Sequence, residues 1–249
     1  MGYWPIVEKV IAESDFVLVV LDARMPEISE NKGVFKMLKK HRKESFRIFT
    51  KIDLASEEVI NKLRKEHPKA FFVSGIKNLG ISNLKRSLLI EAKRKKISYP
   101  LIGIVGYPNV GKSAIINALS KRQKAKISRV AGTTKGIQWI KAGSLKIMDS
   151  PGIVPIEDNE LKLGILGAKN PEKLKNLEKV SIGIIKIFIK NNSEKLENFY
   201  GVKINGKDAY EIFQEIGKSR KFLIKGGEID ENRTSLQIIR DWQSGKLGL

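Results

Sequence analysis

The chain has 249 residues and no cysteine, which excludes a disulfide framework, a cysteine-ligated metal and cysteine-based catalysis. Proteins of a reducing compartment commonly have this composition, and we expect a cytoplasmic location. No apolar stretch approaches the roughly 20 residues that cross a bilayer, and the N-terminus lacks the basic-then-apolar layout of a signal peptide. We therefore expect no membrane partner.

Acidic residues are scarce relative to basic ones. The 27 aspartates and glutamates stand against 47 lysines and arginines, which gives a formal net charge of +20. A protein this basic usually meets a polyanion. Basic clusters lie at residues 39–43, 93–96 and 121–124, although a solvated helix face explains any one of them equally well. No aromatic RNA-recognition motif is visible, so contact with phosphates and shape is favoured over base reading.

The sequence does contain a phosphate-binding loop. Residues 106–113 read Gly-Tyr-Pro-Asn-Val-Gly-Lys-Ser, in which Lys112 would reach the β- and γ-phosphates and the Ser113 hydroxyl would ligate Mg²⁺. An apolar run at 101–105 predicts a strand before the loop, and residues 113–119 predict a helix after it, whose N-terminus favours phosphate. Nucleotide contacts are expected from Asn109, Val110, Gly111, Lys112, Ser113 and Ala114.

Strand and helix patterns alternate over the first part of the chain. Strands are predicted at residues 16–21, 46–49, 70–73 and 101–105, helices at 34–43, 57–66 and 84–96, and a hairpin at 137–140 and 145–148. This alternation predicts a doubly wound, mostly parallel α/β sheet with its ligand at the carboxyl ends of the strands.

The character of the chain changes after residue 155. Helices are predicted at residues 171–190, 194–200, 207–217 and 232–242, with no further strand-rich unit. We therefore predict a nucleotide-binding domain over residues 1–158. Residues 159–249 are predicted to form a smaller, all-helical, basic domain that binds RNA or the ribosome.

Two further segments complete a phosphate and metal site. Asp149 opens an Asp-Ser-Pro-Gly turn after a predicted strand, where its carboxylate can hold Mg²⁺ through water, and Gly152 gives the backbone room to meet the γ-phosphate. Between the two motifs, residues 131–136 supply hydroxyls for the metal. Thr134 is the favoured ligand and Thr133 the alternative.

The segment Thr50-Lys51-Ile52-Asp53 resembles the N-K-x-D guanine reader. The Asp53 carboxylate would accept from guanine N1–H and N2–H₂, which adenine cannot offer, and the Lys51 stem would pack on the base. Thr50 replaces the usual asparagine, so one amide contact is lost or weakened and affinity for GTP is expected to be modest.

A second guanine contact is predicted at the next strand end. There the pair Ser74-Gly75 resembles the backbone turn that meets guanine O6. Together with the reader at residues 50–53, this turn favours guanine over adenine.

The order of these motifs identifies a family. The guanine reader and the Ser-Gly turn precede the phosphate loop, the threonine segment and the Asp-x-Pro-Gly turn, and this order resembles the circularly permuted GTPases of the YlqF/YawG family, relatives of ribosome biogenesis GTPase A. Residues 22–26, 226–230 and 241–248 are also similar to that family, whereas 156–200 match only loosely. The resemblance implies a circularly permuted P-loop GTPase fold, binding of GTP or GDP with Mg²⁺, and a role in large ribosomal subunit assembly with ribosomal RNA as partner. A monomer is expected.

The chain has no glutamine directly after the Asp-x-Pro-Gly turn. Many GTPases place a glutamine after D-x-x-G to orient water, but this chain has Ile153 and then Val154. The resemblance implies a hydrophobic substitution of that glutamine. Some relatives use an N-terminal histidine instead, but the two histidines of this chain, His41 and His67, lie in basic helical segments and are expected to be surface residues.

Catalytic roles are expected for Lys112, Asn109 and Thr134. In related GTPases an asparagine at the position of Asn109 helps to hold a potassium ion, which could stabilise the charge that develops on the phosphates. We expect slow intrinsic turnover, stimulated by a ribosomal partner. Because the predicted switch segments are followed almost directly by the helical domain, we also expect the GTP state to act on that domain.

Three alternatives stay open. The chain could be a nucleotide-binding RNA scaffold with negligible hydrolysis, or a GTPase acting on transfer RNA or another RNA, since a charge of +20 attracts any polyanion. It could also be an ATP-dependent metabolic kinase that uses the same phosphate loop, in which case Asp53 would not matter.

Overall fold

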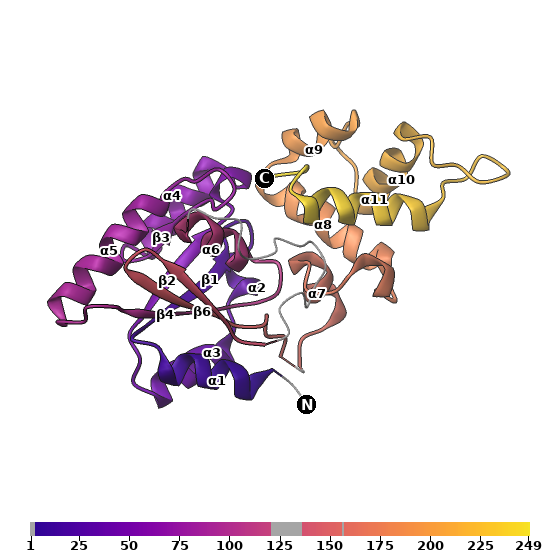
Figure 1. Cartoon of the computed structure of the whole chain (residues 1–249). Coiled ribbons are helices and arrows are strands. Elements are labelled where there is room, and N and C mark those ends of the chain that lie inside the picture. The colour runs from indigo at the N-terminus through magenta and orange to yellow at the C-terminus, as the bar shows by residue number, and fades with distance from the viewer. Residues whose placement is uncertain (1–2, 121–135, 156) are drawn as a thin grey trace. The chain divides into compact units, whose positions relative to one another are not determined.

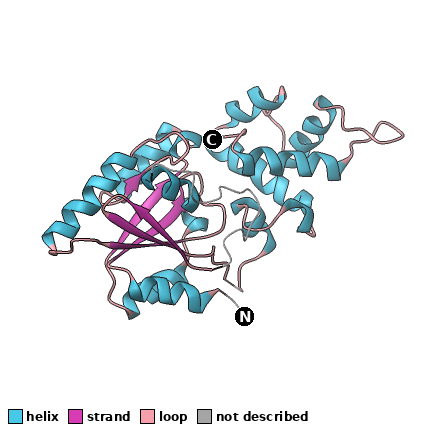
Figure 2. Cartoon of the chain, in the orientation of Figure 1, coloured by secondary structure: helices cyan, strands magenta, loops and turns pink. Residues whose placement is uncertain are grey.

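The computed structural model describes residues 3–120, 136–155 and 157–249. The chain divides into two compact units, Met1–Ile156 and Glu157–Leu249. All the strands lie in the first unit, and the second is helical (Figure 2). Among the described residues, no helix has both the length and the apolar character needed to cross a bilayer.

The first unit is built on one six-stranded sheet in the order β3-β2-β1-β4-β6-β5. Its strands are β1 (Phe16–Asp22), β2 (Ser45–Thr50), β3 (Phe71–Phe72), β4 (Leu101–Val105), β5 (Gln138–Ala142) and β6 (Leu145–Asp149). Neighbouring strands are parallel except in the β5–β6 hairpin. β1 is buried along its whole length, as expected for a central parallel strand that is covered on both faces.

Helices cover both faces of the sheet (Figure 1). One face carries α1 (Trp4–Glu13), α3 (Lys32–Lys40) and α4 (Glu57–Glu66), and a short helix, α2 (Pro26–Ser29), follows β1. Val10, Val34 and Ile60 of the three longer helices share a core with Val19 of β1. The opposite face carries α5 (Ile81–Arg94) and α6 (Lys112–Ser120), which pack on each other.

The second unit contains helices and a short 3₁₀ turn. Its elements are α7 (Glu160–Leu166), η2 (Pro171–Lys173), α8 (Leu177–Asn191), α9 (Ser193–Tyr200), α10 (Ala209–Ser219) and α11 (Glu231–Ser244). Short polar side chains cap the helices, and Asp208 and Glu211 form a capping box at α10. Trp242 anchors the core: its ring packs edge-on against Phe188, and its Nε1 donates to the Ile165 carbonyl at 2.8 Å.

The predicted α/β fold is confirmed, with differences at individual elements. The predicted strand 70–73 is reduced to two ladder residues at the sheet edge, although the Val73 N–H still donates to the Phe49 carbonyl at 2.8 Å. The predicted helix 171–190 is interrupted because Asn176 starts a new helix, its side chain accepting from the Lys179 N–H at 2.8 Å.

Three α-helices of the described residues, α1, α7 and the four-residue α2, lie where the sequence analysis predicts none. The start of α1 carries a recognisable signal, because Pro5 lies in the first turn and the buried Val7, Val10 and Ile11 follow at helical spacing. α7 has only seven residues, too few for a periodic pattern to stand out.

Candidate nucleotide site

The phosphate loop joins the carboxyl end of β4 to the start of α6. Gly106, Asn109 and Gly111 have φ values of 154°, 58° and 107°. A side chain at Gly106 would place its Cβ 2.6 Å from the Val20 carbonyl oxygen, so only glycine fits there. Backbone of this kind, followed by a helix N-terminus, forms the concave sites that bind phosphate.

Lys112 lies across this loop. Its Nζ donates to the carbonyl oxygens of Tyr107 at 2.7 Å and Gly106 at 3.2 Å, and the side chain is buried. Burial lowers the pKa of Lys112 to about 8, and the negative charge of Asp149 opposes that shift. The lysine is therefore held over the loop, where the charge of a phosphate would favour its protonated form.

Two oxygen donors that the sequence analysis predicts to hold Mg²⁺ lie on neighbouring elements. Ser113 lies in the first turn of α6, and the buried Asp149 ends β6, paired with Ile104 of β4. The described residues contain no cluster of three acidic or histidine side chains. A serine hydroxyl and a carboxylate fit Mg²⁺, which usually takes one or two protein oxygens and completes its shell with phosphate and water. The third expected donor, Thr134, and its alternative, Thr133, lie outside the described residues.

The Asp-x-Pro-Gly turn packs directly on the phosphate loop. A Cβ at Gly152 would lie 2.5 Å from the Pro108 nitrogen, so the close approach of the two backbones requires glycine. Ile153 follows with its N–H donating to the Gly106 carbonyl at 3.2 Å, and its side chain is 1% exposed in the core of the first unit. The position where many GTPases have glutamine thus presents neither a polar group nor an exposed side chain.

Thr50 connects the predicted guanine reader to the phosphate loop. Its Oγ1 lies within hydrogen-bonding distance of the carbonyl oxygens of Leu21, at 3.0 Å, and of Val110 in the phosphate loop. A side chain at Gly111 would approach the same hydroxyl at 3.3 Å. Since one hydroxyl has one proton, Thr50 is committed to the protein backbone and has none left for a base.

The remaining reader residues follow immediately. Lys51 has a left-handed backbone, with φ of 56°, and Ile52 begins the 3₁₀ turn Ile52–Leu54. Asp53 lies in that turn with an exposed side chain, as a base-reading carboxylate requires. Lys51 turns the chain sharply at the end of β2. Thr50 before the turn is therefore buried, while Asp53 after it is exposed.

A buried ionic network stands behind Lys51, and the sequence analysis assigns it no role. The Lys51 Nζ lies 2.8 Å from Oδ2 of Asp22, while Arg24 binds the same carboxylate through Nε at 3.1 Å and Nη2 at 2.9 Å. Burial alone would raise the pKa of Asp22, but the charges of Arg24 and Lys51 hold it well below its usual range. Asp22 thereby orients the lysine that is predicted to pack on the base.

The register of the sheet explains why this network forms. Asp22 and Thr50 are direct partners at the ends of β1 and β2, which places Lys51 one residue beyond the carboxylate. In the sequence the two positions are 28 residues apart. The Asp-Ala-Arg segment at residues 22–24 can be seen in the sequence, but only the pairing of β1 with β2 shows that Asp22 contacts Lys51.

The Ser74-Gly75 turn lies against the start of the phosphate-loop helix. The Ser74 hydroxyl accepts from the Lys77 N–H at 3.1 Å, and the Ser74 backbone pairs with Leu79. A Cβ at Gly75 would lie 2.5 Å from the carbonyl carbon of Ala114. The predicted O6 turn therefore contacts the helix that follows the phosphate loop.

The structure brings the predicted site residues that it describes together at the carboxyl ends of the strands. They follow or end the parallel strands β2, β3, β4 and β6, and they are Thr50, Lys51, Ile52, Asp53, Ser74, Gly75, Asn109, Val110, Gly111, Lys112, Ser113, Ala114, Asp149 and Gly152. Their individual roles stay predictions.

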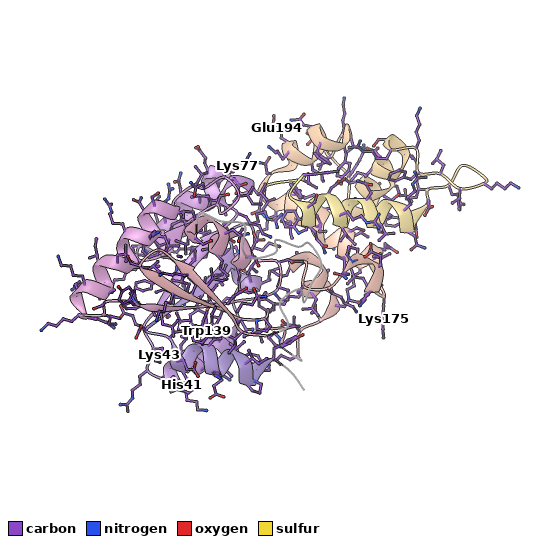
Figure 3. The ribbon with its side chains drawn as sticks, viewed as in Figure 1. His41, Lys43, Lys77, Trp139, Lys175 and Glu194 are labelled. Carbon is purple, nitrogen blue, oxygen red and sulfur yellow. The ribbon has the colours of Figure 1, made fainter. Side chains whose placement is uncertain are left out.

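The two histidines lie elsewhere. His41 and His67 precede β2 and β3, at the amino edge of the sheet, which is the edge opposite the phosphate loop. His41 Nε2 lies 2.9 Å from a Glu8 carboxylate oxygen, and the ring of His67 packs on Phe49 (Figure 3 labels His41). This position argues against a catalytic role for either histidine.

Comparison with known proteins places this geometry in a family. Residues 101–212 match the family described as 50S ribosome-binding GTPase. The chain is 34% identical to ribosome biogenesis GTPase A of Bacillus licheniformis, an alignment that covers 94% of this chain and 88% of that protein. A crystal structure of GNP-bound YlqF from Thermotoga maritima, 26% identical, superposes with a TM-score of 0.61 over 97% of this chain and 93% of that one.

Other relatives are longer. The chain is 37% identical to an uncharacterized GTP-binding protein of Methanocaldococcus jannaschii, over 97% of this chain and 65% of that protein. It is 34% identical to nucleolar GTP-binding protein 2 of Saccharomyces cerevisiae, over 98% of this chain and 52% of that protein. The chain therefore spans between half and two thirds of these two relatives.

Proposed function

Because this chain belongs to the family of circularly permuted GTPases that includes ribosome biogenesis GTPase A, we propose that it binds GTP and acts in assembly of the large ribosomal subunit. The observation that supports the proposal is that the predicted guanine reader, the phosphate loop and the predicted metal carboxylate, Asp149, lie together at the carboxyl ends of the strands. The names of the relatives support the ribosomal role, and the net charge of +20 supports an RNA-rich partner such as ribosomal RNA.

Guanine selectivity is assigned to Asp53. Its exposed carboxylate would accept from guanine N1–H and N2–H₂, while Lys51, oriented by Asp22, would pack on the base. Thr50 adds no contact to the base because its hydroxyl is engaged by backbone carbonyls. We expect moderate affinity for GTP and GDP and much weaker binding of ATP.

Competition between nucleotides tests this assignment and the kinase alternative together. A fluorescent GDP analogue is displaced with GTP, ITP or ATP from the wild-type chain and from Asp53→Ala. The proposal expects GTP to displace best and Asp53→Ala to lose its preference for GTP over ATP. A wild-type preference for ATP, with no effect of the substitution, would contradict it and favour the metabolic kinase.

Hydrolysis is proposed to be slow. Lys112, Ser113 and Asp149, with Thr134, would hold the phosphates and Mg²⁺, and the metal would neutralise charge on the phosphate oxygens. Ile153 cannot orient a water molecule, since its side chain is apolar and buried. We therefore propose that a ribosomal partner stimulates turnover and that the GTP-bound state acts on the helical unit.

The same buried isoleucine favours a second candidate, a nucleotide-dependent RNA scaffold that barely hydrolyses GTP. Multiple-turnover phosphate release, measured with and without purified large subunits, separates the two. Stimulation by subunits supports the GTPase. Turnover that stays at background with subunits present supports the scaffold. Co-sedimentation with subunits in GTP analogue and in GDP tests the partner and the switch, and equal binding in both nucleotides would exclude the switch.

Potassium is proposed as a further cofactor. Asn109 lies in the phosphate loop with φ of 58°, at the position where related asparagines help to hold the ion. Exchange of K⁺ for Na⁺ at constant ionic strength should reduce the hydrolysis rate of the wild-type chain and leave the rate of Asn109→Ala unchanged. Equal wild-type rates in both salts would remove potassium from the proposal.

A further inference from the structure

Most of the excess positive charge belongs to the first unit. Residues 1–156 contain 30 basic and 13 acidic residues, a formal charge of +17, whereas residues 157–249 contain 17 and 14, a formal charge of +3. Within the predicted helical domain, 159–249, the counts are 17 and 12, a formal +5. Charge alone therefore favours the first unit as a surface for a polyanion.

The β5–β6 hairpin presents an unusual face. β5 is an edge strand, and its Lys141 lies directly opposite Lys146 of β6. Trp139 shares that face because it lies two residues from Lys141 on the same strand, and it is 60% exposed (labelled in Figure 3). Both lysines are exposed. We name these three residues the hairpin face.

The other side of the hairpin is conventional. Ile140, Ala142, Leu145 and Ile147 alternate with the exposed residues and are all buried, and both strands contact α6. The hairpin is thus held firmly by its apolar side. Its exposed side chains are a fixed feature of the sheet edge.

The hairpin face is costly without a ligand. Two lysines directly opposite each other repel, and among the described residues neither forms an ion pair with a carboxylate. Lysine on an edge strand discourages the addition of a strand from another chain. This protection explains Lys141 but does not explain the exposed indole of Trp139. An anion between the lysines and a flat apolar group on the tryptophan would satisfy both features together.

We propose that the hairpin face binds an unpaired segment of RNA, with a base stacked on Trp139 and the phosphate backbone held by Lys141 and Lys146. Stacking on an aromatic side chain beside cationic groups is the usual way in which proteins bind single strands without reading sequence. An acidic protein segment would satisfy the lysines, but the carboxylate side chains that bind them offer no ring to the indole, whereas every nucleotide carries both a phosphate and a base. The inference rests on the proposed ribosomal function, since it names a surface for its RNA partner.

The two lysines lie away from the nucleotide. They flank the turn at the amino end of β6, whereas Asp149 lies at the carboxyl end of the same strand. Substitution of the lysines should therefore leave nucleotide affinity intact. Because Trp139 pairs with Met148, one residue before Asp149, the lysine variants are the ones that test the RNA contact independently of the nucleotide site.

The test measures binding of the full chain to fluorescein-labelled oligouridylate of twelve nucleotides by fluorescence anisotropy. Trp139→Ala should weaken binding roughly 5- to 150-fold, the range found when one base-stacking aromatic is lost, and Trp139→Phe should restore most of it. The double substitution Lys141→Gln and Lys146→Gln should weaken binding. It should also make the slope of log K against log[salt] shallower by the amount expected for the loss of about one to two phosphate contacts. A base-paired duplex of equal length should bind with no dependence on Trp139.

The matched control changes the same charge elsewhere. Lys186 and Lys190 are exposed on α8 and lie four residues apart, and their double substitution to glutamine should have a much smaller effect. Equal losses in the two double variants would mean that only net charge matters and would overturn the proposal. So would a polyglutamate peptide that binds wild-type protein more tightly than the oligonucleotide and loses that binding in Trp139→Ala.

A measurement on the wild-type chain needs no folded variant. Iodide should quench the 60% exposed Trp139 most strongly, because Trp242 is fully buried and Trp4 is only partly exposed, and oligouridylate should protect Trp139. Absence of protection at saturating oligonucleotide overturns the hairpin face. If fluorescent GDP and large subunits still bind in that case, the proposed function stands. Failure of the wild-type chain to bind guanine nucleotide would instead overturn the proposed function.

Discussion

The two units treat buried charge in different ways. In the first unit, Asp22 is 1% exposed and its carboxylate binds two cationic side chains, those of Arg24 and Lys51. In the helical unit, Asp241 is 4% exposed and accepts from two neutral groups, the hydroxyl of Tyr200 at 3.1 Å and the amide of Gln237 at 2.9 Å. Ionic networks are expensive to bury, so their use beside the nucleotide site indicates a functional purpose, whereas neutral hydrogen bonds suffice to hold helices together.

Two glycines beside the phosphate loop differ from two glycines in loops of the helical unit. Gly75 and Gly152 have backbone atoms 2.5 Å from the position that a Cβ would occupy, because they meet the phosphate loop and its helix. Gly201 and Gly206 of the helical unit have nothing within 4 Å, and only their φ values of 69° and 75° favour glycine. Gly75 and Gly152 thus allow loops to come together, whereas Gly201 and Gly206 end or turn the chain.

The largest effect is expected from Asp22→Asn, which removes the buried carboxylate that binds both Arg24 and Lys51. Breaking a buried pair in this way costs roughly 3–5 kcal/mol in the free energy of unfolding. Urea denaturation measures the loss, and guanine nucleotide affinity should fall with it.

The control for that prediction is an exposed pair in the helical unit. Arg240 Nη2 lies 2.8 Å from Glu172 Oε1, with side chains 56% and 58% exposed. Glu172→Gln should change stability by at most about 0.5 kcal/mol. Similar losses in the two variants would show that burial does not distinguish the units.

The next effect is expected from Gly152→Ala, whose Cβ would displace the phosphate loop at Pro108. Loss of one hydrogen bond to a charged phosphate costs about 1.5–3 kcal/mol, so GTP should bind roughly 10- to 150-fold more weakly. Fluorescent-nucleotide titration measures the change. Gly206→Ala should cost only about 1–2 kcal/mol of stability, from its left-handed backbone, and should not alter nucleotide affinity.

A smaller effect is expected from pH. The pKa of Lys112 is lowered to about 8 by burial, and bound phosphate must raise it again because phosphate favours the charged form. Binding is therefore strongest below the free-state pKa and weakens above it, by about tenfold between pH 7 and pH 9. Lys112→Arg, whose charge does not titrate in this range, should show a flat profile apart from the titration of guanine itself. A wild-type profile as flat as that of the variant would contradict the assignment.

The smallest effect is expected from Tyr200→Phe, which removes a hydrogen bond to Asp241 but no charge. Burial and the nearby carboxylate raise the pKa of Tyr200, so its hydroxyl stays protonated and donates at all working pH values. Its loss should cost about 1 kcal/mol, seen in thermal unfolding. Guanine nucleotide affinity should stay unchanged. A parallel loss of affinity would show that the two units are coupled in the free protein.

The sequence predicted the sheet unit well because its signals are local. Apolar runs such as residues 16–21 mark buried strands. The phosphate loop is a continuous motif, in which glycine is required where the backbone adopts a positive φ. Short elements such as α7 escaped because seven residues hold no clear period. The total charge was also visible, but its concentration in residues 1–156 emerged only when the boundary between the units was known.

What the sequence determined by itself was the ligand class and the family, because the phosphate loop, the reader and their inverted order are all linear patterns. Tertiary structure decided what Thr50 and Asp22 do. The sequence predicted that Thr50 makes a weakened contact to the base, whereas in the structure its hydroxyl bonds to the Val110 carbonyl. Asp22 carried no assigned role until strand pairing placed it beside Lys51. The physical reason is that hydrogen bonds and buried ion pairs depend on distances across the sheet, which residue spacing along the chain does not encode.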